Sequence, residues 1–260
     1  MSEGAVEGAE IGSTEIRYTP GKEIRGGYHN WDIGTGGSST MLAMSVLPLA
    51  CFAGESTTFR ISGGLFQDFA PSAYHMKHVL FPALGRMGIY ADLEIERPGY
   101  AEHGGGVIKV SVAPVAGKIA AVKLRGRGQI REVRGIALSS HLRRISVSDR
   151  MAKKCSGILR QEGYDARTEA VYDATASHEG AALAIWTEAG GCFFGSDRAG
   201  RKGRRAEGIG SYVANNLIED INSGATVDRF LADQLIIYAA LAEGITEYIV
   251  PRVTAHIEAN

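Results

Sequence analysis

The sequence is poor in cysteine and carries almost no net charge. Its three cysteines, Cys51, Cys155 and Cys192, lie far apart and form no C-x-x-C pair, which argues against a structural zinc site and a disulfide framework. Each lies in an apolar or helical context, where free cysteine packs as a small hydrophobe, so we expect a reducing cytoplasmic compartment. A net charge of −1 argues against a general polyanion binder, so any nucleic-acid contact must come from local Arg and Lys clusters.

No stretch approaches the ~18 uninterrupted apolar residues that a membrane span requires. The N-terminus, M-S-E-G-A-V-E-G, has neither the basic start nor the apolar run of a signal peptide. We therefore expect no membrane partner. The 45% of hydrophobic residues among 260 provide for a sizeable core, in one large domain or two of ordinary size.

Hydrophobic periodicity and turn residues predict a mixed chain whose order of elements changes near Gly117 and returns at Gly224. Before Gly117 we expect a strand at 9–18, a helix at 40–53, a strand at 57–62, a helix at 71–87 and strands at 90–96 and 107–112. After it we expect a strand at 130–138, a helix at 146–161, strands at 167–172, 181–188 and 191–195, and a helix at 204–222. The second set could form a self-contained α+β unit.

The C-terminal stretch carries polar side chains in an otherwise apolar setting. Apolar residues at helical spacing predict a helix that contains Asp233 and Gln234, and Gly244 is a suitable C-cap. The β-branched run 245–250 predicts a strand, so His256 would follow directly after the strand's end. Asp233 and Gln234 either form the polar face of the helix or meet partners in a site. A single histidine in this position is more often structural than catalytic.

A glycine-rich loop, G-T-G-G-S-S at residues 34–39, precedes the first predicted helix. Such a loop either cradles phosphate with its N–H groups or forms a tightly packed helix N-cap. It is not a P-loop, because no Lys follows the glycines. The helix cap is the favoured interpretation.

Two histidines, His75 and His78, stand three residues apart on the second predicted helix and would share one face. No carboxylate or cysteine completes a metal-ligand set around them. We interpret them as a packing or RNA-facing pair.

Arginines cluster at three places. The pairs Arg125/Arg127 and Arg143/Arg144 are interpreted as solvated faces. The third cluster, D-R-A-G-R-K-G-R-R, is a glycine-loosened loop that enters a helix, where side chains and the helix N-terminus can contact phosphates together. It is either a solvated loop or an RNA contact made by Arg201, Lys202, Arg204 and Arg205.

Several of these motifs together resemble those of the RNA 3′-terminal phosphate cyclase family. They are D-I-G-T-G-G-S-S-T, G-Y-A-E-H-G-G-G, R-G-I-A-L, F-L-A-D-Q-L and V-T-A-H, and the resemblance covers essentially the whole chain in order. It implies an α+β fold in which helix pairs on four-stranded sheets repeat to form a large domain over 1–126 and 224–260. A smaller inserted α+β domain, thioredoxin-like, would cover 127–223. The family's usual N-terminal segment, with its G-G-G-Q motif, and its C-terminal tail have no counterpart here.

The resemblance also implies a chemistry. ATP, with Mg²⁺ or Mn²⁺, would adenylylate His256, and AMP would pass to an RNA 3′-phosphate that the neighbouring 2′-hydroxyl then attacks, leaving a 2′,3′-cyclic phosphate. Asp233 would orient the imidazole or hold a ribose hydroxyl, and Gln234 would contact the nucleotide. The other ATP-binding residues implied are Met44, Phe230, Leu231 and Ala232. Met44 and Phe230 stand where many relatives have glutamine and tyrosine, and could enclose adenine by apolar contact.

The partners implied are an RNA with a 3′-phosphate end and a second copy of the chain in a homodimer. Two alternatives stay open. One is a non-catalytic RNA-binding or ribosome-assembly relative, which would lack the histidine. The other is an inactive fragment of the cyclase, without the arginines that the N-terminal segment brings.

Overall fold

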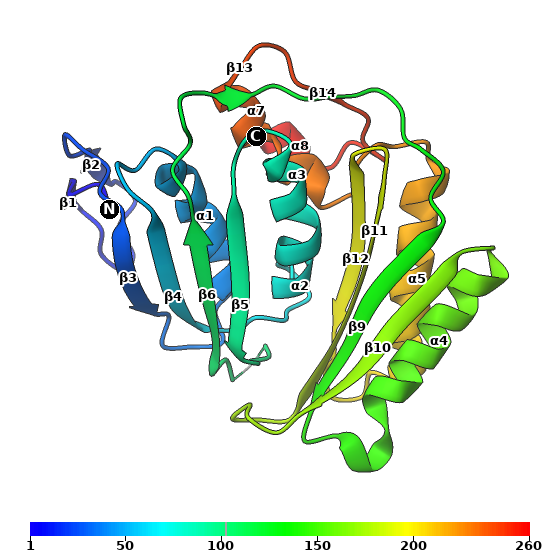
Figure 1. Cartoon of the computed structure of the whole chain (residues 1–260). Helices are drawn as coiled ribbons and strands as arrows, with labels where there is room; N and C mark the ends of the chain where they lie inside the picture. The colour runs from blue at the N-terminus through cyan, green and yellow to red at the C-terminus, as the bar shows by residue number, and fades with distance from the viewer. Residues whose placement is uncertain (102) are drawn as a thin grey trace.

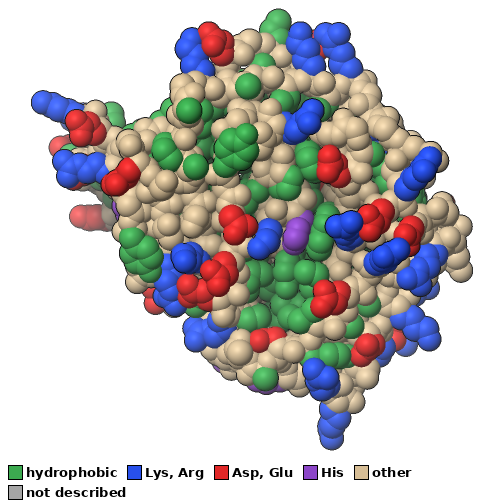
Figure 2. All heavy atoms as spheres, viewed as in Figure 1, with side chains coloured by type: hydrophobic (Ala, Val, Ile, Leu, Met, Phe, Trp, Pro, Cys, Tyr) green, Lys and Arg blue, Asp and Glu red, His purple; other side chains and the backbone are tan. Residues whose placement is uncertain are grey.

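The computed structural model describes residues 1–101 and 103–260. Two four-stranded sheets form its frame, and helices cover one face of each (Figure 1). A helical segment lies between the two sheets and contacts strands of the second. Seen from the same side, hydrophobic side chains gather in a hollow in the middle of the face, with charged side chains around it (Figure 2). The architecture is α+β, as predicted.

The first sheet has the strand order β3-β4-β6-β5. Strands β3 and β4 run parallel and are joined by helix α1, whereas β4, β6 and β5 are antiparallel neighbours. Strand β4 alternates, so Phe59 and Ile61 point into the core. Strand β3 is not predicted from sequence, because its inward pair, His29 and Trp31, is only half apolar. The elements are β3 Gly27–Asp32, α1 Ser39–Cys51, β4 Thr57–Gly63, β5 Ala91–Arg97 and β6 Gly106–Val112.

The helical segment between the sheets has three parts, α2 Ala73–His75, a π-helical turn at Met76–Leu80 and α3 Phe81–Gly85. Ser72 caps it, because its hydroxyl accepts a hydrogen bond from the His75 N–H at 3.1 Å. The π turn comes before Pro82, which has no N–H to donate to an earlier carbonyl. The segment is two residues shorter at each end than the predicted helix 71–87.

The second sheet has the order β10-β9-β11-β12. Strands β9 and β10 are parallel and connected through α4, while β11 and β12 form a hairpin. Gly190 and Gly191 both take positive φ in its turn, which suits a tight hairpin. The elements are β9 Glu132–Ser140, a 3₁₀ turn Arg143–Ile145, α4 Val147–Gln161, β10 Asp165–Asp173, β11 Gly180–Ala189, β12 Cys192–Ala199 and α5 Ala206–Asn222. These match the predicted order strand, helix, three strands, helix.

The C-terminal stretch differs from the predicted helix and strand. In place of one helix and one strand it forms α6 and α7, two very short strands, and a last helix, α8. The strand predicted at 245–250 is confined to two residues, paired with the segment after β6, and His256 lies in the first turn of α8 rather than after a strand. The elements are β7 Ile119–Ala120, β8 Lys123–Leu124, α6 Leu231–Gln234, α7 Ile236–Leu241, β13 Ala242–Glu243, β14 Glu247–Tyr248 and α8 Ala255–Ala259.

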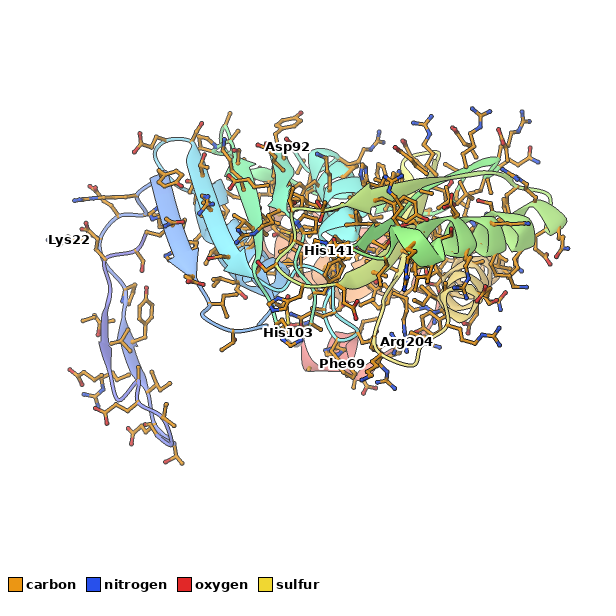
Figure 3. The ribbon with its side chains drawn as sticks, turned by 90° about the horizontal axis from the view of Figure 1, so that it is seen from below. Lys22, Phe69, Asp92, His103, His141 and Arg204 are labelled. Atoms are coloured by element: carbon orange, nitrogen blue, oxygen red, sulfur yellow. The ribbon has the colours of Figure 1, made fainter. Side chains whose placement is uncertain are left out.

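The N-terminal segment also differs from the prediction. Most of the strand predicted at 9–18 is instead the tip of an antiparallel hairpin between β1 Ala5–Glu7 and β2 Arg17–Thr19, and only its last two residues are paired. This hairpin projects from the body next to Lys22 (Figure 3). It has no core to bury its alternating side chains, and Ile11 and Ile16 stay exposed.

The buried side chains of both sheets belong to one continuous hydrophobic core. Strands β9 and β11 nevertheless pair in a sheet separate from β6. The division into a main domain and an insert at 127–223 therefore stays a prediction. None of the helices in the described ranges is long and apolar enough to cross a membrane.

Candidate active site

A cavity of about 610 Å³ lies where α1, the loop before α2, strand β12 and the C-terminal helices meet. Its walls come from segments that are far apart in the sequence, and Phe69 stands exposed at its edge. The lining residues include Met41, Met44, Gln67, Asp68, Phe69, Asp197, Arg198, Tyr212, Arg229, Phe230, Asp233, Gln234, Arg252, Thr254 and His256.

Five of the seven predicted catalytic and ATP-binding residues line this cavity. They are Met44, Phe230, Asp233, Gln234 and His256. Two others do not: Leu231 and Ala232 are buried with exposures of 0% and 1%, because they occupy the inward side of α6. Those two hold the helix in the core and do not face a ligand.

Asp228 fixes the start of α6. Its Oδ1 accepts hydrogen bonds from the N–H groups of Phe230 and Leu231 at 2.7 and 2.8 Å, which satisfies donors that the helix itself leaves open. Its Oδ2 accepts from the Gly195 N–H at 2.7 Å and lies 3.1 Å from His75 Nε2. This wholly buried carboxylate therefore joins α6 to β12 and to α2.

The Asp228–His75 contact shows why an apolar core tolerates two polar side chains. Burial disfavours the His75 cation, but the neighbouring Asp228 overrides this effect, so the pKa of His75 is raised. The His78 ring stacks on Trp186 with 3.8 Å between centroids, and burial lowers its pKa to about 4. The packing interpretation of the two histidines is the one that fits these contacts, because both rings lie against the β11–β12 hairpin, His75 beside Gly195 and His78 on its strand partner Trp186.

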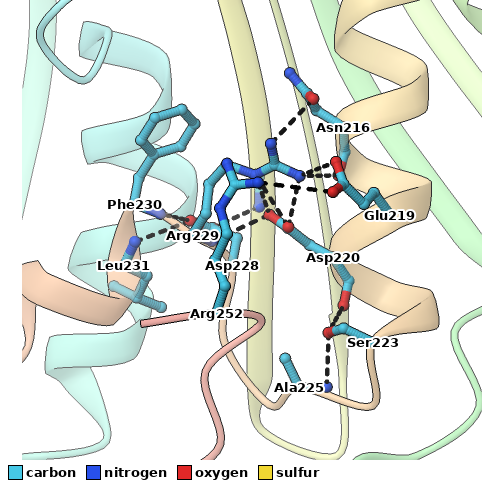
Figure 4. A network of polar contacts seen from close by, with 11 residues as sticks. Asn216, Glu219, Asp220, Ser223, Ala225, Asp228, Arg229, Phe230, Leu231 and Arg252 are labelled. Atoms are coloured by element: carbon cyan, nitrogen blue, oxygen red, sulfur yellow. Dashed lines mark hydrogen bonds and ion pairs between the residues drawn. The ribbon is translucent and has the colours of Figure 1, made fainter. Parts of the chain in front are cut away.

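Arg229, which the sequence does not single out, ties α6 to α5 from the cavity side (Figure 4). Its guanidinium donates to Asp220 at 2.7 Å, to Glu219 at 2.7 Å and to the Asn216 side chain at 3.0 Å. Asp220 is only 2% exposed. Such a fully bonded buried pair has a defined geometry, so the residue before Phe230 is tied to α5.

Two polar groups of α6 face the cavity with few partners of their own. Burial raises the pKa of Asp233, and its own backbone and the proximity of His256 offset this only in part. The Oε1 of Gln234 is buried without a hydrogen-bond partner in the described chain. A buried acceptor of this kind is normally satisfied, so the described protein groups leave one acceptor of Gln234 unused.

The last residues are brought to the cavity by local bonds. The Thr254 hydroxyl caps α8 by accepting from the Ile257 N–H at 3.3 Å, which places His256 in the first helical turn. Upstream, the Tyr248 hydroxyl donates to the Ala232 carbonyl at 2.8 Å. The strand-to-helix connection is thus fixed against α6, and His256 stays exposed at the cavity's rim.

The opposite wall is a cluster of charges around Asp68. Arg204 donates to both its carboxylate oxygens at 2.7 Å, and Arg198 lies 3.3 Å away. The hydrogen bond from Arg204 lowers the pKa of Asp68. Arg198 also lies over the Tyr212 ring at 4.1 Å. The cavity therefore combines an apolar wall with cationic groups.

The glycine-rich loop acts as a helix cap, the interpretation favoured from its sequence. The Ser38 hydroxyl accepts from the Met41 N–H at 3.1 Å, and Gln67 Nε2 donates to the Gly36 carbonyl at 2.5 Å. The loop delivers Met41 and Met44 on α1 to the cavity, whereas its glycines do not line it.

The arginines of the predicted clusters lie in different surroundings, and Arg127 is partly buried rather than on a solvated face. Arg125 pairs with Glu247 at 2.6 Å, and Arg127 donates to the Ile221 carbonyl at 2.6 Å. The third cluster borders a second cavity of about 520 Å³. Over the described ranges, no group of three or more His, Cys, Asp or Glu side chains could hold a metal ion.

A cavity with an aromatic wall, an unsatisfied amide and a histidine beside a carboxylate is the kind of site that takes a polar ligand with a flat apolar part. The sequence matches the family described as RNA 3′-terminal phosphate cyclase over residues 1–260. The chain is 35% identical over 264 residues to the RNA 3′-terminal phosphate cyclase of Archaeoglobus fulgidus, covering 100% of the chain and 76% of the relative. The proteins of that name from Methanococcoides burtonii and Thermococcus kodakarensis are 33% and 34% identical, each over 261 residues, covering 100% of the chain and 75% and 74% of the relative.

The chain therefore belongs to the RNA 3′-terminal phosphate cyclase family. This confirms the resemblance that the sequence motifs indicate.

Proposed function

We propose that the chain is an ATP-dependent RNA 3′-terminal phosphate cyclase, a ligase-type enzyme in which His256 accepts AMP. The observation that carries this proposal is the meeting of Met44, Phe230, Asp233, Gln234 and His256 around one cavity. Family relatives bear the name of this activity. The presence of the histidine in the cavity favours an enzyme over a non-catalytic relative.

The adenine would lie between Phe230 and Met44, where an aromatic face and a thioether offer apolar contact. The unpartnered Gln234 Oε1 would accept from the amino group of the base. Asp233, whose pKa is raised by burial, would hold a ribose hydroxyl or orient the imidazole of His256.

In the first step, an imidazole nitrogen of His256 attacks the α-phosphorus of ATP, and the bond to pyrophosphate breaks. An oxygen of the RNA 3′-phosphate then attacks the AMP phosphorus and breaks the P–N bond. Finally the 2′-hydroxyl attacks the 3′-phosphorus, its proton leaves, and AMP departs from a 2′,3′-cyclic phosphate end.

The phosphates need cationic partners. Arg252 is suited to this role. Its guanidinium lies 3.7 Å from the Glu219 carboxylate and its side chain is 55% exposed, and an exposed ion pair of this kind holds a side chain weakly. The described ranges supply no three-ligand metal cage. Mg²⁺ or Mn²⁺ would accompany the triphosphate, held by its oxygens and by water, and would neutralise charge on the pyrophosphate. Three buried free thiols suit a reducing cytoplasm, the compartment that we propose.

The test is conversion of an RNA whose 3′-terminal phosphate carries the label, with ATP and Mg²⁺. A terminal phosphate is removed by phosphatase and a cyclic phosphate is not, so the product should become phosphatase-resistant, and acid should restore sensitivity. A label that stays phosphatase-sensitive with either metal, while the chain is folded, would contradict the proposal.

A further inference from the structure

We infer that the second cavity binds the RNA strand upstream of the 3′ end, as a subsite for a stacked base and its phosphates. This inference deepens the proposed function and rests on it for the identity of the strand. The cavity of about 520 Å³ lies between the second sheet, the start of α5 and the loop before β6.

Its charge is strongly one-sided. Among the residues that the structure describes, five cations line it, Arg150, Arg201, Lys202, Arg204 and Arg205, and one carboxylate, Glu179. Two of the five are already paired, because Arg150 bonds Glu207 at 2.7 Å and Arg204 bonds Asp68 at 2.7 Å. No described carboxylate lies within ion-pair distance of the other three, Arg201, Lys202 and Arg205, all of which are exposed.

Backbone dipoles add to this field. The three cations flank the N-terminus of α5, a helix of 17 residues whose N-cap, Arg205, makes no side-chain capping bond. The N-cap side chain leaves the first-turn N–H groups unused, and of these the Glu207 N–H is bonded by its own carboxylate. Cations and a helix start in one cavity are suited to phosphate oxygens.

The remainder of the cavity is suited to a nucleobase. Its floor is apolar, with Tyr100, Ala181 and Ile209 nearly fully buried. At its side the exposed rings of His103 and His178 stack on each other, with 4.4 Å between centroids and 22° between planes. Flat rings beside cationic groups are the means by which proteins bind unpaired RNA bases.

The position of the cavity relates it to the proposed active site. Arg204 lines the second cavity, and its partner Asp68 lines the first. The two cavities therefore share one wall, and His103, Phe69 and Arg204 lie along the same edge of the molecule (Figure 3). A strand whose terminal phosphate reaches His256 can cross this wall and place an upstream nucleotide in the second cavity.

The test measures equilibrium binding to RNAs of one, three and six nucleotides that end in a 3′-phosphate, by calorimetry between about 50 and 200 mM salt. The wild-type chain should bind the longer RNAs more tightly than the single nucleotide. In Arg201→Ala/Lys202→Ala the affinity advantage of the longer RNAs should fall roughly tenfold. The slope of log affinity against log salt should become about 1.4 shallower, the change expected for the loss of two single-strand phosphate contacts. The control Lys123→Ala/Arg131→Ala removes the same charges from exposed positions that line neither cavity, and should behave as wild type.

A second variant isolates stacking from charge. His178→Ala should weaken binding of the longer RNAs by about fivefold or more, with the salt slope unchanged. The inference is overturned if both variants bind every length as wild type does, or if they lose the same factor for the single nucleotide as for the longer RNAs. It is also overturned if pyrophosphate, present at the RNA concentration, abolishes the length dependence, since the cavity would then take a free anion.

Binding of RNA needs no ATP, so the two proposals fail separately. Length-dependent binding that the variants lose, in a chain that forms no cyclic phosphate, would reject the enzyme and keep the subsite. Formation of a cyclic phosphate by a chain whose RNA affinity does not depend on RNA length would reject the subsite and keep the enzyme.

Discussion

The substitution Asp228→Asn tests how the candidate site is held. The carboxylate accepts four bonds, from the N–H groups of Gly195, Phe230 and Leu231 and from His75. Asparagine keeps one acceptor oxygen, so its NH₂ group must face two of these donors. Hydrogen bonds to a charged group contribute about 1.5–3 kcal/mol each, and breaking a buried charge pair costs about 3–5 kcal/mol.

We therefore expect Asp228→Asn to lower the free energy of unfolding by about 3–5 kcal/mol. Urea denaturation would measure it, with an unchanged m-value showing that the same surface unfolds. The matched control is Asp165→Asn, which breaks an exposed pair with Arg167 and should cost at most about 1 kcal/mol.

The loss should also depend on pH. The pKa of His75 is raised because Asp228 outweighs the effect of burial, so the pair's stabilisation is complete below the unfolded value of about 6.5. It is lost as pH rises through the higher folded pKa. The difference between wild type and variant should therefore shrink in alkali. A cost below about 1 kcal/mol at acidic to neutral pH, equal to that of the control, would refute the role given to Asp228.

Three further substitutions probe the same region. Asp233→Asn should stabilise the chain at pH 8 but not in acid, because the pKa of Asp233 is raised and ionising this buried carboxyl costs stability as pH rises through that pKa. Melting temperatures of variant and wild type that are equal at both pH values would contradict this. Gly195→Ala should cost about 1–3 kcal/mol, since its new Cβ would lie 2.7 Å from Val79 Cγ2 and 2.9 Å from His75 Cδ2, and a neutral result in urea would show that both side chains move aside freely. Arg229→Ala should cost about 3 kcal/mol or more by leaving the buried Asp220 unpaired, and urea denaturation showing under about 1 kcal/mol would mean that α5 relaxes to hydrate it.

Prediction from sequence succeeds where one element carries its own signal. The helix at 147–161 buries one face, with Met151, Cys155 and Leu159 at helical spacing, and the strands of the second sheet alternate or run apolar. These patterns are local, so they survive folding unchanged. For Asp233 and Gln234 the sequence leaves two possibilities, a polar helix face or partners in a site, and the structure places both residues at the cavity.

It fails where distant contacts decide the structure. The β-branched run after Gly244 extends for only two paired residues, because its partner strand, Lys123–Leu124, is no longer than that. The partners of Asp228 lie 33 and 153 residues away, and nothing near Asp228 in the sequence indicates them. Residues of the cavity were predicted from the family resemblance, whereas Arg229 and the wall around Asp68 appear only in the fold.

The central claim is that His256 accepts AMP, and labelling with α-labelled ATP and Mg²⁺ tests it most directly. The wild-type chain should gain a label that is labile in acid and stable in alkali, as a phosphoramidate is. His256→Ala should abolish the label, whereas His78→Ala, whose ring packs on Trp186 away from the cavity, should retain it. Label that persists in folded His256→Ala protein, or that never forms on the folded wild-type chain, would contradict the account.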